Sequence, residues 1–140
     1  MKNDISAIGN DLVDTVFKVE HNLITELGLE IDQMTLSSAE EHAPIIERLI
    51  ASGADTVSDC GGSATNSLVA AASYGAKCFH VCKVSDDEDG KRYLQSLKEA
   101  GVDHQGNKAS ADSLPTGKCL ILVTPDAKRT MTTALNVSSL

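Results

Sequence analysis

The chain has 140 residues, 41% of them hydrophobic and 23% charged, a composition typical of one folded globular domain. Its 20 acidic residues outnumber its 12 lysines and arginines, and a net charge of -8 disfavours nucleic acid and anionic membranes as partners. Every apolar stretch is far shorter than the roughly 20 residues that a membrane span needs. Because the N-terminus also lacks a signal-peptide pattern, we expect a cytoplasmic protein.

The first part of the sequence alternates strands and helices. Residues 4–9 read as a strand, and residues 12–19 alternate apolar and polar positions, as in a half-buried strand at an edge or in a flap. A capping-box pattern at Ser38 predicts the start of a helix that ends near Gly53. Residues 55–60 read as the next strand.

The alternation continues and then gives way to a β-rich segment. We predict a helix at 64–74, a strand at 77–84, an acidic loop at 86–90 and a helix at 91–100. Residues 116–124 and 129–137 flank a turn and predict a hairpin. The fold class is therefore α/β, with a doubly wound, mostly parallel sheet and a small β flap.

The four cysteines are not arranged in any C-x-x-C pair. We expect them to be reduced, with Cys78 and Cys82 packed as small apolar side chains on one face of a strand. A zinc site that combines these thiols with His80 is an alternative, but the spacing fits no usual ligand framework. We predict no metal site in the chain.

The glycine turn at residues 61–66, Gly-Gly-Ser-Ala-Thr-Asn, is the main candidate site. Glycines let a ligand approach the backbone, and the next helix offers unpaired amides and the positive end of its dipole. We expect Ser63 to cap this helix and Asn66 to face the same pocket. The alternative is a plain turn with a capped helix. A dinucleotide site is disfavoured because the turn lacks the G-x-G-x-x-G pattern, and the chain has no Walker P-loop.

Four motifs, in this order, resemble those of the PfkB (ribokinase-like) family of sugar and nucleoside kinases. They are I-G-N-D-L-V-D at 8–14, G-G-S-A-T-N at 61–66, C-K-V-S-D-D-E-D-G at 82–90 and P-T-G-K-C at 115–119. The second and fourth are most similar to those of adenosine kinase-like members. The resemblance implies a ribokinase-like fold in which residues 1–140 form the N-terminal part of the kinase domain. Its α/β core would carry lid strands at about 11–35 and 116–137.

The resemblance also implies which residues contact the substrate. The positions that grip sugar hydroxyls in the family fall on Asn10, Asp14, Gly61, Gly62, Ser63 and Asn66. Leu12 and Cys119 would line an apolar wall, and Arg129 resembles a lid arginine near the transferred phosphate, with a plain surface residue as the alternative. The carboxylate of Asp14 suits this role because it can accept hydrogen bonds from two vicinal hydroxyls.

The family's catalytic Asp, its anion hole and most of its ATP and Mg²⁺ contacts lie in a later D-T-x-G-A-G-D segment, which residues 1–140 do not contain. The resemblance thus implies a parent protein that uses ATP and Mg²⁺ to phosphorylate a nucleoside or sugar hydroxyl. We expect the 140 residues alone to be inactive, because phosphoryl transfer depends on positioning and electrostatic stabilisation. The alternative is a sugar- or nucleoside-binding module, or an inactive remnant of the fold.

Two further expectations concern departures from the family pattern and the end of the sequence. Cys82 and Ser85 replace glycines of the family's acidic loop, so the backbone there is expected to differ from that of the family. Residues 136–140 are expected to continue a sheet. The unpaired edge would favour a homodimer or another association.

Overall fold

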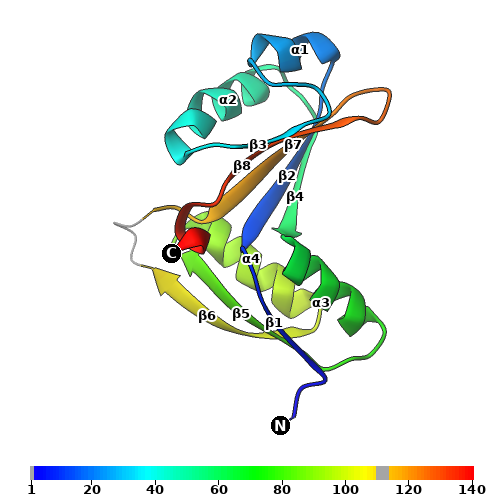
Figure 1. Ribbon diagram of the computed structural model, residues 1–140, viewed down its shortest axis with the longest axis vertical. Coiled ribbons are helices and arrows are strands. Elements are labelled where there is room, and N and C mark those ends of the chain that lie inside the picture. Colours follow the sequence, from blue (N-terminus) through cyan, green and yellow to red (C-terminus); the bar gives the residue numbers. More distant parts are fainter. Residues whose placement is uncertain (1, 110–113) are drawn as a thin grey trace.

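The computed structural model describes residues 2–109 and 114–140 and contains two sheets, which meet where β1 runs into β2 (Figure 1). The first is a parallel sheet of order β1-β5-β6, made of β1 (Ile5–Ile8), β5 (Cys78–Ser85) and β6 (Val102–Ala109). Helices α3 (Ser63–Ser73) and α4 (Glu88–Glu99) pack against these strands. This part of the molecule is the predicted α/β core.

The second sheet has five strands in the order β3-β8-β7-β2-β4 and is mixed. Its strands are β2 (Leu12–Lys18), β3 (Met34–Leu36), β4 (Thr56–Gly61), β7 (Gly117–Val123) and β8 (Arg129–Ala134). Helices α1 (His21–Glu26) and α2 (Ala39–Ala51) lie beside it, away from β1, β5 and β6 (Figure 1). β7 and β8 form the predicted antiparallel hairpin.

Local sequence signals explain where the longer helices begin. The capping box at α2 is confirmed: the Ser38 hydroxyl accepts from the Glu41 amide (3.2 Å), and the Glu41 carboxylate accepts from the Ser38 amide (2.7 Å). Gly53 follows α2 with a φ of 69°, as expected of a left-handed stop. At α4 the Asp87 carboxylate accepts from the Gly90 amide (2.7 Å), so the acidic loop provides the cap of this helix.

Each sheet has its own apolar core. The core under the parallel sheet joins Val13, Leu68, Tyr93 and Leu97 to the inward side of β5, where Cys78 and Cys82 are buried as predicted. The core of the five-stranded sheet joins Phe17, Leu120 and Leu122 to buried residues of α1 and α2. The two cores are linked through β2, because Val13 belongs to the first and Phe17 to the second.

The structure corrects several predictions in the second sheet. β2 is not an edge strand, because it pairs with both β4 and β7, and β4 belongs to this sheet rather than to the parallel one. Helix α1 and strand β3 were not predicted, since a short helix and a three-residue strand contain too few residues to show a period. Residues 136–139 form a 3-10 helix rather than a continuing strand, so the expected open edge at this end is wrong.

Other corrections concern the parallel sheet and its loops. β6 was missed, because only its parallel pairing with β5 marks Val102–Ala109 as a strand. Neither Cys82 nor Ser85 has a positive φ, so both fit an ordinary strand. All four cysteines are free, and in the described part of the chain no group of three or more metal-ligating side chains could hold a metal. None of the described helices is long and apolar enough to cross a membrane.

Candidate functional site

The predicted substrate residues meet where β2 lies between two glycines. Leu12 faces Gly61 on β4 and Gly117 on β7. A Cβ atom at Gly117 would lie 2.8 Å from Cδ2 of Leu12 and 2.6 Å from the carbonyl oxygen of Asp11. The strands can therefore approach one another here only because these positions lack a side chain.

Asp14 lies directly over Gly61. A Cβ atom at Gly61 would collide with the carboxyl group of Asp14, so the carboxylate occupies the space that the glycine leaves. Asp14 is half-buried, and burial together with the neighbouring Asp59 carboxylate raises its pKa. Among the described residues no cation forms an ion pair with Asp14. The carboxylate is therefore available to accept hydrogen bonds from a ligand.

The glycine turn brings the start of α3 to the same place. Gly62 has a φ of 98°, and a Cβ atom there would collide with the carbonyl oxygen of Asn10. Gly62, rather than the predicted Ser63, is the N-cap of α3, and no side chain caps the helix. Ser63 and Asn66 are exposed in its first turn. The first-turn amides are thus open to a ligand, at the positive end of the helix dipole.

Cys119 shares the row of Asp14 across the sheet. The two residues are register partners on β2 and β7, and Thr133 donates its hydroxyl to the Cys119 sulfur (3.2 Å). Burial raises the pKa of the Cys119 thiol, and the nearby Asp14 carboxylate acts in the same direction. The thiol therefore stays neutral and adds apolar surface beside the carboxylate.

Asp59, Asp14, Cys119 and Thr133 form a polar row across four strands of the sheet. An apolar row runs parallel to this polar row on the same face of the sheet. It takes one residue from each strand, in register across all five: Val57, Val16, Ile121, Met131 and Met34. Val57 is 71% exposed and Met34 55% exposed, so no part of the described chain covers the ends of the row. One face of the sheet therefore presents hydrogen-bonding groups next to a broad apolar strip, which suits a ligand with both kinds of surface.

Arg129 does not lie with the other predicted residues. It is exposed at the start of β8 and faces Val123, whereas Cys119 faces Thr133 four residues further along. That spacing corresponds to about 13 Å along a strand. The structure therefore brings together Asn10, Leu12, Asp14, Gly61, Gly62 and Cys119, with Ser63 and Asn66 adjoining, and it places Arg129 apart from them.

Behind the site lies a buried polar cluster that the sequence did not predict. Asp11, His80, Tyr93 and Thr65 are at most 1% exposed. The Asp11 carboxylate contacts Nε2 of His80 (2.7 Å) and accepts from the Tyr93 hydroxyl (3.0 Å), which lies 2.6 Å from the Thr65 hydroxyl. One signal was present: a histidine in the middle of an apolar strand needs buried polar partners.

A second unpredicted connection joins the acidic loop to β7. The Asp87 carboxylate accepts from both the amide (2.8 Å) and the hydroxyl (2.6 Å) of Thr116. Burial works to raise the pKa of Asp87, but these bonds and the Gly90 amide outweigh it and lower the pKa. Asp89 is paired with Lys118 (2.6 Å). The acidic loop is therefore used to tie the two sheets together.

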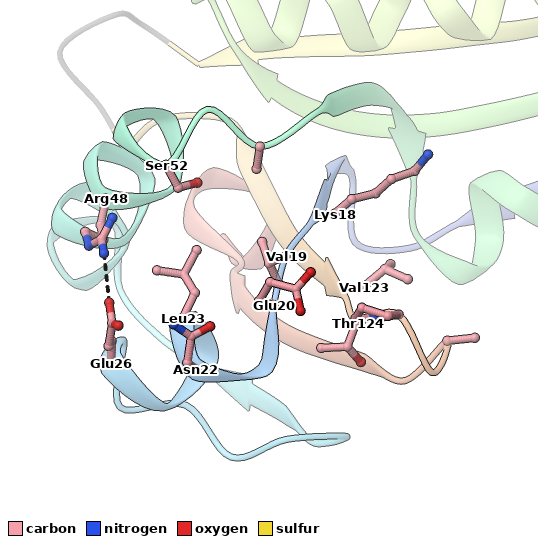
Figure 2. Close-up of a pocket in the computed structure, with 13 residues that line it drawn as sticks. Lys18, Val19, Glu20, Asn22, Leu23, Glu26, Arg48, Ser52, Val123 and Thr124 are labelled. Atoms are coloured by element: carbon pink, nitrogen blue, oxygen red, sulfur yellow. Dashed lines mark hydrogen bonds and ion pairs between the residues drawn. The ribbon is translucent and has the colours of Figure 1, made fainter.

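A separate cavity lies at the other end of the five-stranded sheet (Figure 2). It has a volume of about 690 Å³, an apolar floor that includes Val19 and Leu23, and a rim with the Arg48–Glu26 ion pair (2.8 Å). None of the predicted substrate residues lines it. Its charged side chains are exposed and of both signs, so they do not select a class of ligand. This cavity is therefore a weaker candidate for the functional site than the group of residues around Asp14.

Comparison with known proteins identifies one family and several similar solved structures. The model of the pfkB family of carbohydrate kinases matches residues 30–139. Similar solved structures include an adenosine kinase from Sinorhizobium meliloti (29% identity, TM-score 0.86), a probable sugar kinase protein from Rhizobium etli (26%, 0.86) and an adenosine kinase from Anopheles gambiae (26%, 0.80). They match 98%, 99% and 95% of this chain, which spans 40%, 41% and 39% of their lengths. No match was found among curated proteins.

Proposed function

The chain belongs to the pfkB family of carbohydrate kinases, and from this premise we propose that it forms the substrate-binding portion of a kinase that phosphorylates a hydroxyl of a nucleoside or sugar. In this proposal the five-stranded sheet is a lid whose open face covers the substrate. The α/β core lies at one end of this sheet, where β1 runs into β2 and where the glycine turn joins β4 to α3 (Figure 1).

The observation that carries the proposal is the packing of Asp14 on Gly61. The carboxylate is half-buried, has no cationic partner in the described chain and lies beside another carboxylate, that of Asp59. An anionic ligand would be repelled by this pair, whereas a neutral vicinal diol can donate two hydrogen bonds to Asp14. The expected ligand is therefore a neutral polyol, before it is phosphorylated.

We further propose that the ligand is a nucleoside of the adenosine type. The apolar row through Val16 and Ile121 runs beside the Asp14 row, so a flat base can lie on apolar surface while the ribose reaches the carboxylate. The likeness to two adenosine kinases, at 29% and 26% identity, supports a nucleoside, and the likeness to a probable sugar kinase at 26% keeps a free sugar as the alternative.

ATP and Mg²⁺ are proposed as cofactors of the parent protein only. The described residues do not fit a Mg²⁺ site, because Asp87 accepts hydrogen bonds from Thr116 and Gly90, and Asp89 is paired with Lys118. We propose that phosphoryl transfer needs groups from the remaining length of the parent, and that the 140 residues alone transfer no phosphate.

Calorimetric titration with adenosine, ribose and fructose tests the proposal, first on this chain and then on the longer parent protein. We expect adenosine to bind and Asp14→Asn to weaken binding by at least tenfold, because a charge-assisted hydrogen bond contributes about 1.5–3 kcal/mol. Asp55→Asn is the matched control, since Asp55 is exposed just before β4 and lies outside the predicted site. Absence of binding by both proteins would refute the proposal.

A binding module without kinase activity is the second candidate. It rests on the same convergence of the predicted substrate residues around Asp14, which binding alone would also require. It predicts adenosine binding by the 140 residues and no ADP release by the longer protein with ATP and adenosine. ADP release that depends on adenosine would exclude it.

A further inference from the structure

The buried cluster of Asp11, His80, Tyr93 and Thr65 lies directly behind the two segments that form the candidate site. Asp11 stands between Asn10 and Leu12 at the start of β2. Thr65 lies in the first turn of α3, between Ser63 and Asn66. The cluster therefore joins, through the core, two chain segments that are far apart in sequence and that both face the substrate in the proposed function.

The hydrogen-bond geometry favours a cationic His80. Nδ1 of its ring lies 3.1 Å from the carbonyl oxygen of Ala7, which can only accept a hydrogen bond. Nε2 lies 2.7 Å from Oδ1 of Asp11, and Oδ2 of the same carboxylate accepts from the Lys83 amide (2.6 Å). With Asp11 ionised, both ring nitrogens donate, which is the imidazolium form. Burial works to lower the pKa of His80, but the bonds to Asp11 and Ala7 outweigh it and raise the pKa.

The surroundings of the ring contain no competing anion among the described residues. Thr65 from α3 and Tyr93 from α4 place hydroxyls 3.3 and 3.2 Å from Nε2. Burial raises the pKa of the Cys82 thiol to about 12, with the Asp11 charge acting in the same direction, so this neighbour on β5 is neutral. On β6 the register partner of His80 is His104, and the Lys83 side chain reaches the Leu140 carbonyl instead (3.4 Å). Asp11 is therefore the counter-ion of His80.

A buried ion pair of this kind is weak evidence for stability. Well-packed apolar residues of similar volume often give a fold that is equally stable or more so. An ion pair with fixed geometry instead orients the chain segments that carry its two partners, because leaving either partner unpaired is costly. Here the oriented parts are the Asn10 carbonyl, which packs on Gly62, and the first turn of α3.

We propose that the Asp11–His80 ion pair, extended through Tyr93 to Thr65, is a positioning device that holds the Asn10 segment and the first turn of α3 in the geometry that binds the substrate. This inference rests on the proposed function for its substrate, but the positioning itself is measurable without a ligand. Asp11, His80, Thr65 and Tyr93 touch no substrate in this scheme. They act through Asn10, Gly62 and Asn66.

Three variants separate positioning from plain stability. His80→Gln removes the cation, and Tyr93→Phe removes only the hydroxyl that links Asp11 to Thr65, so the core packing is kept. His42→Gln is the matched control: His42 is also a buried histidine (3% exposed), but it bonds to Thr132 (3.2 Å) in the five-stranded sheet. The control alters stability without touching the Asp11 cluster.

Nitrogen-15 NMR of the wild-type chain gives the first readout. We expect both ring nitrogens of His80 to be protonated at pH values above the ordinary histidine pKa of about 6.5. A neutral ring at pH 7 would overturn the proposal. The second readout is amide hydrogen exchange, which reports local opening. His80→Gln and Tyr93→Phe should speed exchange of the Asn66 amide, which donates to the Gly62 carbonyl (2.9 Å), about tenfold or more, and His42→Gln should not.

Adenosine titration gives the third readout. We expect an affinity loss of about tenfold for His80→Gln and Tyr93→Phe, the size of one hydrogen bond that is no longer aligned, and little change for His42→Gln. Unchanged affinity in both variants, or an equal loss in His42→Gln, would overturn the proposal. If the wild type binds no nucleoside, the proposed function fails instead, and the NMR and exchange results still decide whether the ion pair positions the turn.

Discussion

The contact between Asp14 and Gly61 can be tested by a double-mutant cycle. The three atoms closest to a Cβ atom placed on Gly61 are the carboxyl carbon and both carboxylate oxygens of Asp14. Gly61→Ala should therefore destabilise the fold by about 1–3 kcal/mol, the usual cost of overpacking. Asp14→Ala removes all three of these atoms. In that background Gly61→Ala should cost less than about 0.5 kcal/mol, so the coupling energy should be at least about 1 kcal/mol.

Urea denaturation followed by circular dichroism measures the four free energies of unfolding. The linear dependence on urea allows them to be compared if the slope is unchanged between variants. Gly61 has no positive φ, so an alanine there carries no backbone strain to confuse the result. Additive costs, with Gly61→Ala equally harmful with and without the carboxylate, would show that Asp14 does not occupy the space over Gly61.

Two further predictions concern Asp59 and the helix starts. Burial and Asp59 raise the pKa of Asp14, so ligand binding that needs its carboxylate should be lost as pH falls through this raised pKa. Asp59→Asn should move this loss to lower pH. Titrations of adenosine across the acid range measure the midpoint of the loss, and a midpoint that does not move would contradict the prediction. Ser38→Ala should cost about 0.5–2 kcal/mol, whereas Ser63→Ala should be nearly neutral, because only Ser38 caps its helix through its side chain. Thermal unfolding of both variants measures the difference, and equal losses would contradict the assignment of Gly62 as the N-cap.

The sign of the Asp14 effect on stability follows from the same shift. A carboxyl group whose pKa is raised by folding binds protons more tightly in the folded state than in the unfolded state. Ionised Asp14 therefore lowers the stability of the fold at neutral pH, and this cost disappears as pH falls below its ordinary pKa. A residue that opposes stability in this way, in the space that Gly61 leaves open, is a candidate for a functional role.

Local sequence rules were sufficient to predict the elements whose start and stop signals lie in their own residues. The helix from Ser38 to Gly53 has a capping box at one end and a left-handed glycine at the other, and both operate as predicted. The α/β class was also predicted correctly from the alternation of strands and helices, and the PfkB family from four ordered motifs. These features depend on residues that are close together in the sequence, so the sequence alone was enough to place them.

Non-local pairing explains what the sequence could not show. The alternation in β2 predicts a strand at an edge or in a flap, because Asp14 and Val16 look like solvent-facing positions. Both instead belong to rows of residues that continue across β4 and β7. β6 is a strand only because it lies beside β5. Strand neighbours are set by tertiary packing, and a polar position in one strand can therefore be a binding face, an exposed face or an interior row.

The buried ion pair of Asp11 and His80 was not predicted because its partners are distant in the sequence. It lies next to the candidate site. Asp11 lies inside the motif that predicted Asn10 and Asp14, but its partner His80 is far away in the sequence, on a strand that otherwise reads as apolar core. In the segment 10–12, Asn10 and Leu12 lie at the candidate site, whereas Asp11 is buried against β5. In the proposed function, a ligand that contacts Asn10 or Asp14 would bind to a segment that the buried Asp11 anchors. This anchoring would keep the exposed side chains in one geometry before the ligand binds.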